Sequence, residues 1–538
     1  MTHPLKQNYW NAHPLADQVE RASNDPAARE LWAYLDGVSH GPAEPVRLYV
    51  HCTAERFSVR VVLDDPSQAV AWELKDLAGL RQHTPEDAAV NGCGWHSPVI
   101  LPLTSGWRPG PYRVELSAEQ DGEQLQAEAF FVLRNEAQAN RASRIAMVLT
   151  TSTWNAYNDW GGANSYRSVQ EDGASIDMPA PVLSTQRPWA RGFLSLPADM
   201  PRHGDASGDL APGEGPSYPC IDWALERGYS RHCSDAGWAF YERPFHHWLI
   251  EQGYQVDLLT QEDLHLRPAC LDGYGVALLV GHDEYWSWEM RDAMDAFVER
   301  GGRLARFAGN MLWQIRLDLE AGLQTCYKLA SYDPVHESEE PRRTTTYWDS
   351  VLVNRPAAAS FGITASSGGY HRYGLCSPRA SGGYTVYKPD HWALAGSGLF
   401  YGDVFGAGES RIVGFEVDGA DYGMRFGQPY ATGRDGAPQD LEIIAMVPAT
   451  KGERAAPGQV LNAPLADGLG LMQAVPSIND RTPEQAEFGA GMVVAFQRGR
   501  GQVFNAGCCA WVTGLIRRDV SVEGITNNVL RKFLQPQL

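Results

Sequence analysis

Residues 274–310, "YGVALLVGHDEYWSWEMRDAMDAFVERGGRLARFAGN", decide the fold class of this chain. The apolar run 274–281 is typical of a buried strand, because its apolar residues follow one another without alternation. The stretch 287–302 predicts a helix with one apolar face that ends at its final glycines. The run 303–309 is a second apolar strand. A strand, a helix and a strand in this order predict parallel strands joined by a crossover helix.

The same alternation extends through the rest of the chain. "RIAMVLTT" (144–151) is a strand of the buried type, and "FHHWLIEQG" (245–253) predicts a helix that leads into the strand 254–260. Near the end, 491–507 predicts a hairpin and 525–534 a helix. We therefore expect an α/β fold built on a doubly wound, mostly parallel sheet.

Residues 43–140 follow a different pattern. Stretches such as "PVRLYVHC" and "RFSVRVVLDD" alternate apolar and polar residues between turn signals, which predicts a β-sandwich. Residues 1–42 are polar and predict a partly helical segment that includes "AARELWAYLDG". The α/β catalytic domain is expected to span 141–538. Two regions interrupt it, a Gly-, Pro- and Ser-rich loop at 199–235 and a β-rich insertion at 330–490.

The composition limits the partners of the protein. A formal charge of −20 argues against nucleic acid and anionic membranes. The chain has no run of about 18 apolar residues, and its start lacks the apolar centre of a signal peptide. We therefore expect a cytoplasmic protein without a membrane span. Nine cysteines without a CxxC spacing predict neither a disulfide framework nor a thiolate zinc site.

Polar side chains follow the expected strands at four places. In open α/β sheets, ligands bind at the carboxyl ends of the strands, so these side chains are candidates for a common site. The candidates are Asn155 with Tyr157, His282 with Glu284, Asn310, and Glu416.

Each candidate also has a structural explanation. Asn155 could cap a turn, Tyr157 could be a core aromatic residue, and Asn310 could occupy a turn that needs positive φ. Glu416 alternates with apolar neighbours and could face solvent. The acids of "HDE" (282–284) could cap the following helix, where negative charge is favourable.

Several familiar catalytic motifs are missing from the sequence. It contains no GxSxG nucleophile elbow, no HExxH zinc motif and no GxxxxGK[ST] phosphate loop. Cys508 and Cys509 follow a strand in "NAGCCAW" and leave a thiol nucleophile open as an alternative. A free cysteine is more often an inert buried residue.

The long motif at 281–316 resembles the core signature of the large (beta) subunit of N,N-dimethylformamidase and its relatives. The similarity covers roughly residues 90 to 535. The other stretches that carry it are "NAYNDWGGANSY" (155–166), "FHHWLIEQGYQVDLLTQEDLH" (245–265), "DHWALAGSGLFYGDVFG" (390–406), "VGFEVDG" (413–419) and "GQVFNAGCCAWVTGL" (501–515). The catalytic domain of that family is similar to the glutamine-amidotransferase fold without its cysteine. Asn310 stands where that nucleophile would be expected.

The resemblance implies an amide hydrolase with one iron ion held by two tyrosines and one glutamate. Residue by residue, it implies Tyr157 and Glu284 as iron ligands and Glu416 as the general base. It implies that His282 and Asn310 orient the ligands or hydrogen-bond the developing oxyanion. Phenolate and carboxylate oxygens are hard donors that suit iron.

The sequence departs from the family at the second tyrosine. In relatives this residue follows an Arg-Pro pair, whereas the matching position in "STQRPWARG" (184–192) is Trp189. An indole N–H cannot ligate iron. Three outcomes stay open: Tyr166 or Tyr218 supplies the ligand, the site has two protein ligands and more water, or the metal and the activity are lost.

The expected function is therefore iron-dependent hydrolysis of the C–N bond of a small amide. Aromatic residues near the motifs suit a small, mostly apolar pocket. The alternatives are a non-catalytic ligand-binding protein that lost the metal and a cysteine-dependent amide hydrolase. A homo-oligomer is an ordinary expectation for such an enzyme, and relatives can pair with a small second subunit.

Overall fold

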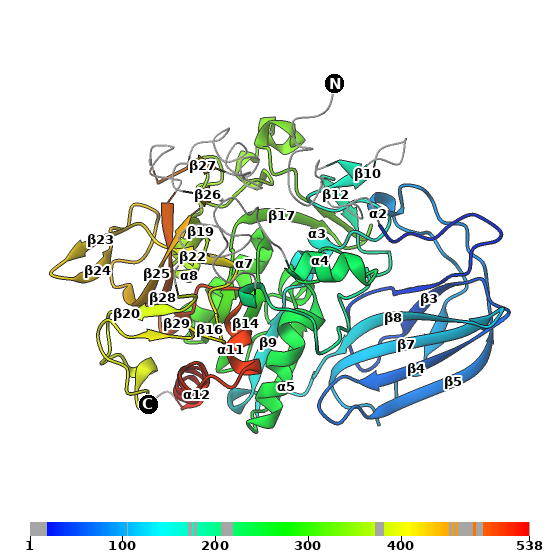
Figure 1. Cartoon of the computed structure of the whole chain (residues 1–538), viewed down its shortest axis with the longest axis horizontal. Helices are drawn as coiled ribbons and strands as arrows, with labels where there is room; N and C mark the ends of the chain where they lie inside the picture. The colour runs from blue at the N-terminus through cyan, green and yellow to red at the C-terminus, as the bar shows by residue number, and fades with distance from the viewer. Residues whose placement is uncertain are drawn as a thin grey trace.

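A sandwich of two β sheets lies beside a larger body of strands and helices in the computed structural model of the chain (Figure 1). The structure describes residues 19–104, 106–169, 175–176, 180–205, 219–371, 381–450, 454–456, 459–460, 477–479 and 488–536. None of the helices in these ranges is long and apolar enough to span a bilayer.

The sandwich consists of a three-stranded and a five-stranded sheet. The smaller sheet has the order β1 (Leu31–Leu35), β3 (Val46–Cys52), β6 (Val99–Leu101). The larger has the order β2 (Ser39–His40), β8 (Glu123–Leu133), β7 (Gly110–Gln120), β4 (Arg56–Leu63), β5 (Val70–Ala78). Alternate residues of both sheets, such as Leu48 and Val59, share one apolar cluster, which explains the two-residue period of the sequence.

The helix predicted over "AARELWAYLDG" is wrong. This stretch forms strand β1, which pairs antiparallel with β3. Leu31 and Ala33 point into the sandwich core, and the ring of Tyr34 stacks on Tyr49 at 5.1 Å. Pairing with β3 therefore outweighs the local preference for a helix. No helix occurs in the described residues 19–42, and residues 1–18 lie outside the described part.

One large sheet forms the centre of the α/β body. Its parallel half has the order β13 (Val256–Thr260), β9 (Ile145–Leu149), β14 (Val276–His282), β16 (Arg303–Gly309), β29 (Gly501–Asn505). It continues antiparallel through β28 (Phe488–Arg498), β25 (Glu442–Thr450), β19 (Thr364–Tyr370) and β22 (Glu416–Gly419). The sheet is thus mixed, and the prediction of a mostly parallel sheet is correct only for the first half.

The β-rich region 330–490 extends this sheet. It supplies β19, β22 and β25, a short strand β20 (Tyr384–Val386) that pairs with β25, and β21 (Val404–Phe405), which pairs with β20. The expected loop 199–235 also contains a helix, α4 (Pro219–Glu226). Residues 206–218 of that region, including Tyr218, lie outside the described part.

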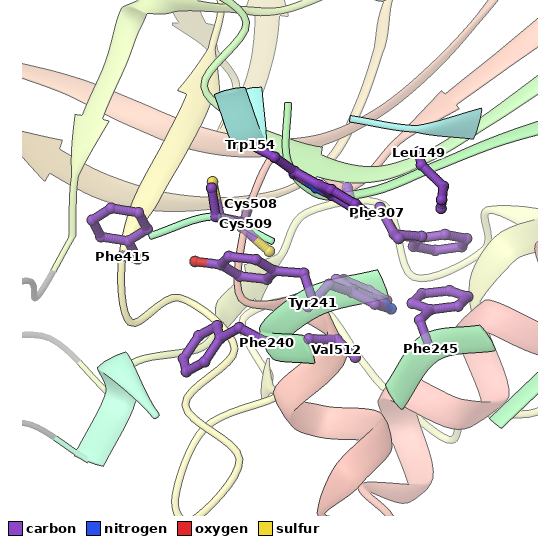
Figure 2. Packing of buried hydrophobic residues seen from close by; sticks show 14 of the residues in the cluster. Leu149, Trp154, Phe240, Tyr241, Phe245, Phe307, Phe415, Cys508, Cys509 and Val512 are labelled. Atoms are coloured by element: carbon purple, nitrogen blue, oxygen red, sulfur yellow. The ribbon is translucent and has the colours of Figure 1, made fainter. Parts of the chain in front are cut away.

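Helices cover both faces of the parallel half. Side chains of α5 (Arg243–Glu251), α11 (Trp511–Ile516) and α12 (Val520–Leu534) share a cluster with Ile145 and Met147 of β9. Side chains of α6 (Gln261–Leu266) and α7 (Trp288–Glu299) share another with Ala146 and Val148. Figure 2 shows the first cluster, in which Phe245, Phe307 and Val512 pack together. Apolar residues on both sides of each strand explain the continuous apolar runs of the sequence.

Candidate metal and catalytic site

The carboxylate of Glu284 is the meeting point of two phenols and an indole. Tyr157 donates its hydroxyl to Oε2 at 3.0 Å, and Tyr166 donates to Oε1 and Oε2 at 3.0 and 2.9 Å. The Nε1–H of Trp313 donates to Oε1 at 2.7 Å. Burial and the charge of Glu284 raise the pKa of both phenols well above its usual value. Three oxygen-bearing side chains therefore converge in a buried space.

The short helix α3 (Thr151–Tyr157) places the first phenol. It begins directly after β9, so Tyr157 lies beyond the carboxyl end of that strand. The Thr153 hydroxyl accepts the backbone N–H of Glu284 at 3.0 Å and ties α3 to the loop after β14. The Asn164 side chain then joins the two tyrosines, because it donates to Tyr157 O at 3.0 Å and accepts from Tyr166 N at 2.8 Å.

A second group lies next to this carboxylate. His282 donates Nδ1–H to the backbone oxygen of Asp235 at 2.7 Å. Its Nε2 faces Glu416 Oε2 at 2.8 Å, the Asn310 amide nitrogen at 3.0 Å and Glu284 Oε2 at 3.4 Å. The strands β14, β16 and β22 thus bring Glu416 next to two residues that precede it by more than a hundred positions.

The two carboxyl groups beside His282 differ in their acidity. Burial raises the pKa of Glu416, and the opposing effect of His282 does not cancel this. For Glu284, burial is outweighed by the hydrogen bond and charge of His282, so its pKa is lowered. Glu284 therefore keeps its negative charge more readily, whereas Glu416 takes up and releases a proton more readily. Such a pair, with pKa values pushed apart, is typical of acid–base sites.

A comparison with protein families places the chain in a family. A family model described as "N,N-dimethylformamidase beta subunit-like, C-terminal" matches residues 65–526. The chain belongs to the N,N-dimethylformamidase beta subunit-like family. The resemblance predicted from the sequence motifs is confirmed, and the match includes every residue of the site. A comparison with curated proteins gives no match.

For a member of the N,N-dimethylformamidase beta subunit-like family, Trp189 is the unexpected residue. Its ring packs edge-to-face on Trp154 at 5.9 Å and stacks on Phe193 at 6.2 Å. It also lines a cavity of about 570 Å³ between the sandwich and the α/β body. Among the described residues, the phenols that reach Glu284 are Tyr157 and Tyr166. Tyr166 thus reaches the same carboxylate as Tyr157, whereas Tyr218 lies outside the described residues.

Asn310 has the backbone conformation that a turn after a strand requires. Its φ is 66°, and its N–H donates to Asp418 Oδ1 at 2.7 Å. Arg306 binds Asp418 at 2.7 Å and Asp283 at 2.9 Å, and all three side chains are fully buried. The alternative explanation, that the acids of "HDE" cap the next helix, does not apply. Ser287 caps α7, because its hydroxyl accepts the N–H of Met290.

Three residues of the site were not predicted from the sequence. The Lys328 ammonium lies 3.5 Å above the ring of Tyr166, and burial lowers its pKa to about 8. His232 packs against Tyr157 and binds the carboxylate of Asp235 at 2.8 Å. The dense polar stretch "SRHCSD" (230–235) was the only sequence signal for the last two. Lys328 lies on a loop and had no signal.

Asn155 and Cys508 lie outside the groups around Glu284 and His282, and Cys509 lies at the edge of the His282 group. Asn155 is buried beside Arg187, which donates to its backbone oxygen at 3.2 Å. Cys508 and Cys509 are packed among aromatic rings (Figure 2). Burial raises the pKa of the Cys508 thiol to about 12 and that of Cys509 well above its usual value. Cys509 Sγ nevertheless lies close to His282 and Glu416, with ligand atoms within 4.8 Å of one another.

Proposed function

We propose that this chain is an iron-dependent hydrolase that cleaves the C–N bond of a small amide, as the N,N-dimethylformamidase family description suggests. The observation that carries the proposal is the convergence of Tyr157, Tyr166 and Glu284 on one buried point. Two phenols and one carboxylate are the ligand types that the family resemblance implies. Tyr166 would replace the tyrosine that is missing at Trp189.

The donor chemistry of this point fits an iron ion. Phenolate and carboxylate oxygens are hard donors, and three protein ligands leave coordination positions for other molecules. Tyr157, Tyr166 and Glu284 would hold the ion and would lose their shared hydrogen-bond protons to solvent. When bound there, the ion would act as a Lewis acid toward an amide carbonyl.

The residues beside the donors would handle the protons. Glu416 would take the proton of the attacking water and pass it to the leaving amine. His282 lies 2.8 Å from Glu416, and its bond to the Asp235 carbonyl fixes the orientation of the ring. The side-chain amide of Asn310 faces the same space and would donate to the oxyanion that develops on the substrate.

We further propose that the α/β body is a doubly wound, amidotransferase-like domain. Five neighbouring parallel strands with helices on both faces support this proposal. Asn310, at the end of β16, would stand in place of the nucleophile of that fold. The family description names a beta subunit, so we propose that the chain works with a small second subunit or with further copies of itself. The cytoplasmic location stays a prediction.

The two alternatives have less support. The cysteine hydrolase would need a reactive thiolate, but Cys508 and Cys509 are at most 1% exposed and burial disfavours their charged forms. The non-catalytic alternative was based on Trp189, which stands where a tyrosine ligand is expected. That reason no longer applies if Tyr166 supplies the missing ligand.

Metal analysis and a visible spectrum of the purified protein test the proposal. We expect about one iron per chain, a phenolate–iron absorption band, and release of amine from N,N-dimethylformamide or a related small amide. Tyr166→Phe should lose the band and most of the iron, whereas Trp189→Phe should keep both. A colourless, iron-free and inactive protein after expression in iron-rich medium would sink the proposal. Full iron binding by Tyr166→Phe would overturn the ligand assignment alone.

A further inference from the structure

Cys509 belongs to a buried cluster that the proposed hydrolysis does not explain. Nε2 of His282, a carboxylate oxygen of Glu416 and Sγ of Cys509 lie within 4.8 Å of one another. They come from the end of β14, from β22 and from the turn after β29. All three residues are at most 8% exposed. An imidazole, a carboxylate and a thiol at this spacing have the chemistry of a metal site.

His282 is held as a metal-binding histidine usually is. Its Nδ1–H donates to the backbone oxygen of Asp235 at 2.7 Å, so Nε2 is the nitrogen that can bind an ion once it gives up its proton. Histidine ligands commonly fix their second nitrogen on a backbone carbonyl in this way. Nε2 therefore lies beside Glu416 and Cys509 without any rearrangement of the ring.

Glu416 turns a buried oxygen toward the same point. Its Oε2 lies 2.8 Å from His282 Nε2, and the two form an ion pair when the ring is protonated. Without that shared proton, both atoms are acceptors. Two buried acceptors at this distance repel each other unless a cation or a proton lies near both.

We propose that His282, Glu416 and Cys509 form a second cation site, which binds a divalent ion of the zinc type and thereby inhibits the hydrolysis. Nitrogen, oxygen and sulfur together suit a borderline ion, whereas the oxygens at Glu284 suit iron. On binding, the thiol proton of Cys509 and the proton shared by His282 and Glu416 leave to solvent, and Sγ, Nε2 and a carboxylate oxygen bond the ion. The ion occupies the lone pairs that Glu416 needs as a base. Only the inhibition rests on the proposed function.

Cobalt(II) is the probe for the binding part of this proposal. Titration of Co²⁺ into the iron-loaded full chain should give one equivalent of a thiolate–cobalt band in the near ultraviolet. Cys509→Ser and Cys509→Ala should both lose the band and weaken Co²⁺ binding at least about tenfold. Cys508→Ser is the matched control, since Cys508 is equally buried but outside the cluster, and it should keep the band. Thermal unfolding checks that each variant is folded.

The outcomes separate this site from the proposed hydrolysis. No band in the parent protein, or a band that survives both Cys509 variants, overturns the cation site. Loss of the band in Cys508→Ser as well as in the Cys509 variants also overturns it. Zn²⁺ should inhibit amine release by the parent and by Cys508→Ser about equally, and Cys509→Ser should need at least about tenfold more Zn²⁺. Equal inhibition of all three proteins overturns the inhibitory role. If the chain has no amidase activity, the cobalt titration still decides whether the site exists.

Discussion

Asn310 combines a left-handed backbone with a side chain that faces His282. The substitution Asn310→Gly separates these two properties, because glycine accepts positive φ but has no side-chain amide. We expect the midpoint of thermal unfolding to stay the same or rise, while kcat falls about 10²- to 10³-fold, as for the loss of an oxyanion donor.

Asn354 provides the control for this variant. It also has positive φ, at 52°, but it is exposed on the surface. Asn354→Gly should leave kcat unchanged. Comparable activity losses in both glycine variants would show that the backbone, and not the Asn310 amide, is what matters.

Glu242 predicts a pH dependence of stability. It ends η4 (Trp238–Glu242), and its Oε1 accepts from the Thr150 hydroxyl at 2.8 Å and from Trp154 Nε1 at 2.9 Å. Burial raises the pKa of Glu242 to about 7, so between its usual value and 7 the folded protein holds a proton that the unfolded chain has lost. The free energy of unfolding therefore falls as pH rises through this window, by about 3 kcal/mol.

Glu242→Gln removes this titration and keeps the oxygen that accepts both hydrogen bonds. In urea unfolding at pH 8, the variant should be more stable than the parent by up to about 3 kcal/mol. At pH 4 the advantage should vanish, because the parent carboxyl is then protonated in both states. Glu226→Gln, at an exposed position, should show no such pH-dependent difference. An advantage of the same size at both pH values would contradict the explanation.

At the scale of elements, the turn after α3 decides the distance between the two phenols. Asn164 is fully buried and joins Tyr157 O, Tyr166 N and Arg167 N. Asn164→Ala should lower the free energy of unfolding by about 1–3 kcal/mol, because these groups lose a buried partner. It should also lower the iron content of the purified protein.

The readouts for this variant are urea unfolding and metal analysis. Asn91→Ala is a suitable comparison, since the Asn91 side chain bonds Asp87 on the surface. It should change neither quantity. Normal iron content in Asn164→Ala would show that the turn does not control the geometry of the two phenols.

Element patterns explain which parts of the protein were predictable. The buried strands β9, β14 and β16 carry continuous apolar runs, and α7 carries an apolar face. The pattern of apolar residues alone therefore predicts these elements. Strand β1 was predicted as a helix because "ARELWAYL" suits a helix locally, and only its partner β3 makes it a strand. The sequence made Glu416 and His282 candidates for one site, but Glu416 is the first residue of β22 and does not follow a strand as predicted. Lys328, His232 and Asp235 lie on loops, whose course no periodicity describes.

At the scale of the molecule, Asp64 joins the sandwich to the α/β body. Its buried carboxylate accepts from Trp238 Nε1 at 2.8 Å and from Arg243 Nε at 2.9 Å. Although burial opposes it, the charge of Arg243 and these hydrogen bonds hold the pKa of Asp64 below its usual value. The stability that Asp64 contributes is therefore present at neutral pH and is lost as pH falls through the lowered pKa.

Removal of the Asp64 carboxylate should lower the stability of the folded protein strongly. Asp64→Ala leaves Arg243 and the Trp238 N–H without their partner and should lower the free energy of unfolding by about 3 to 5 kcal/mol. Differential scanning calorimetry measures this loss and shows whether the sandwich then unfolds separately. Glu123→Ala breaks an exposed pair with Arg29 and should cost less than about 1 kcal/mol. Similar losses in both variants would argue against a special role for the buried junction.

The order of strands in the large sheet has a consequence for synthesis on the ribosome. Strand β29, made from residues near the end of the chain, lies between β16 and β28 in the middle of the sheet. Until those residues leave the exit tunnel, one side of β16 has no strand to pair with. Cys509 is then not yet in place beside Glu416. The sandwich can fold while translation continues, but the cluster around His282 can close only after residue 509 has been made. A nascent chain that stalls before residue 501 would therefore expose a bare strand edge, which is a target for chaperones and for aggregation.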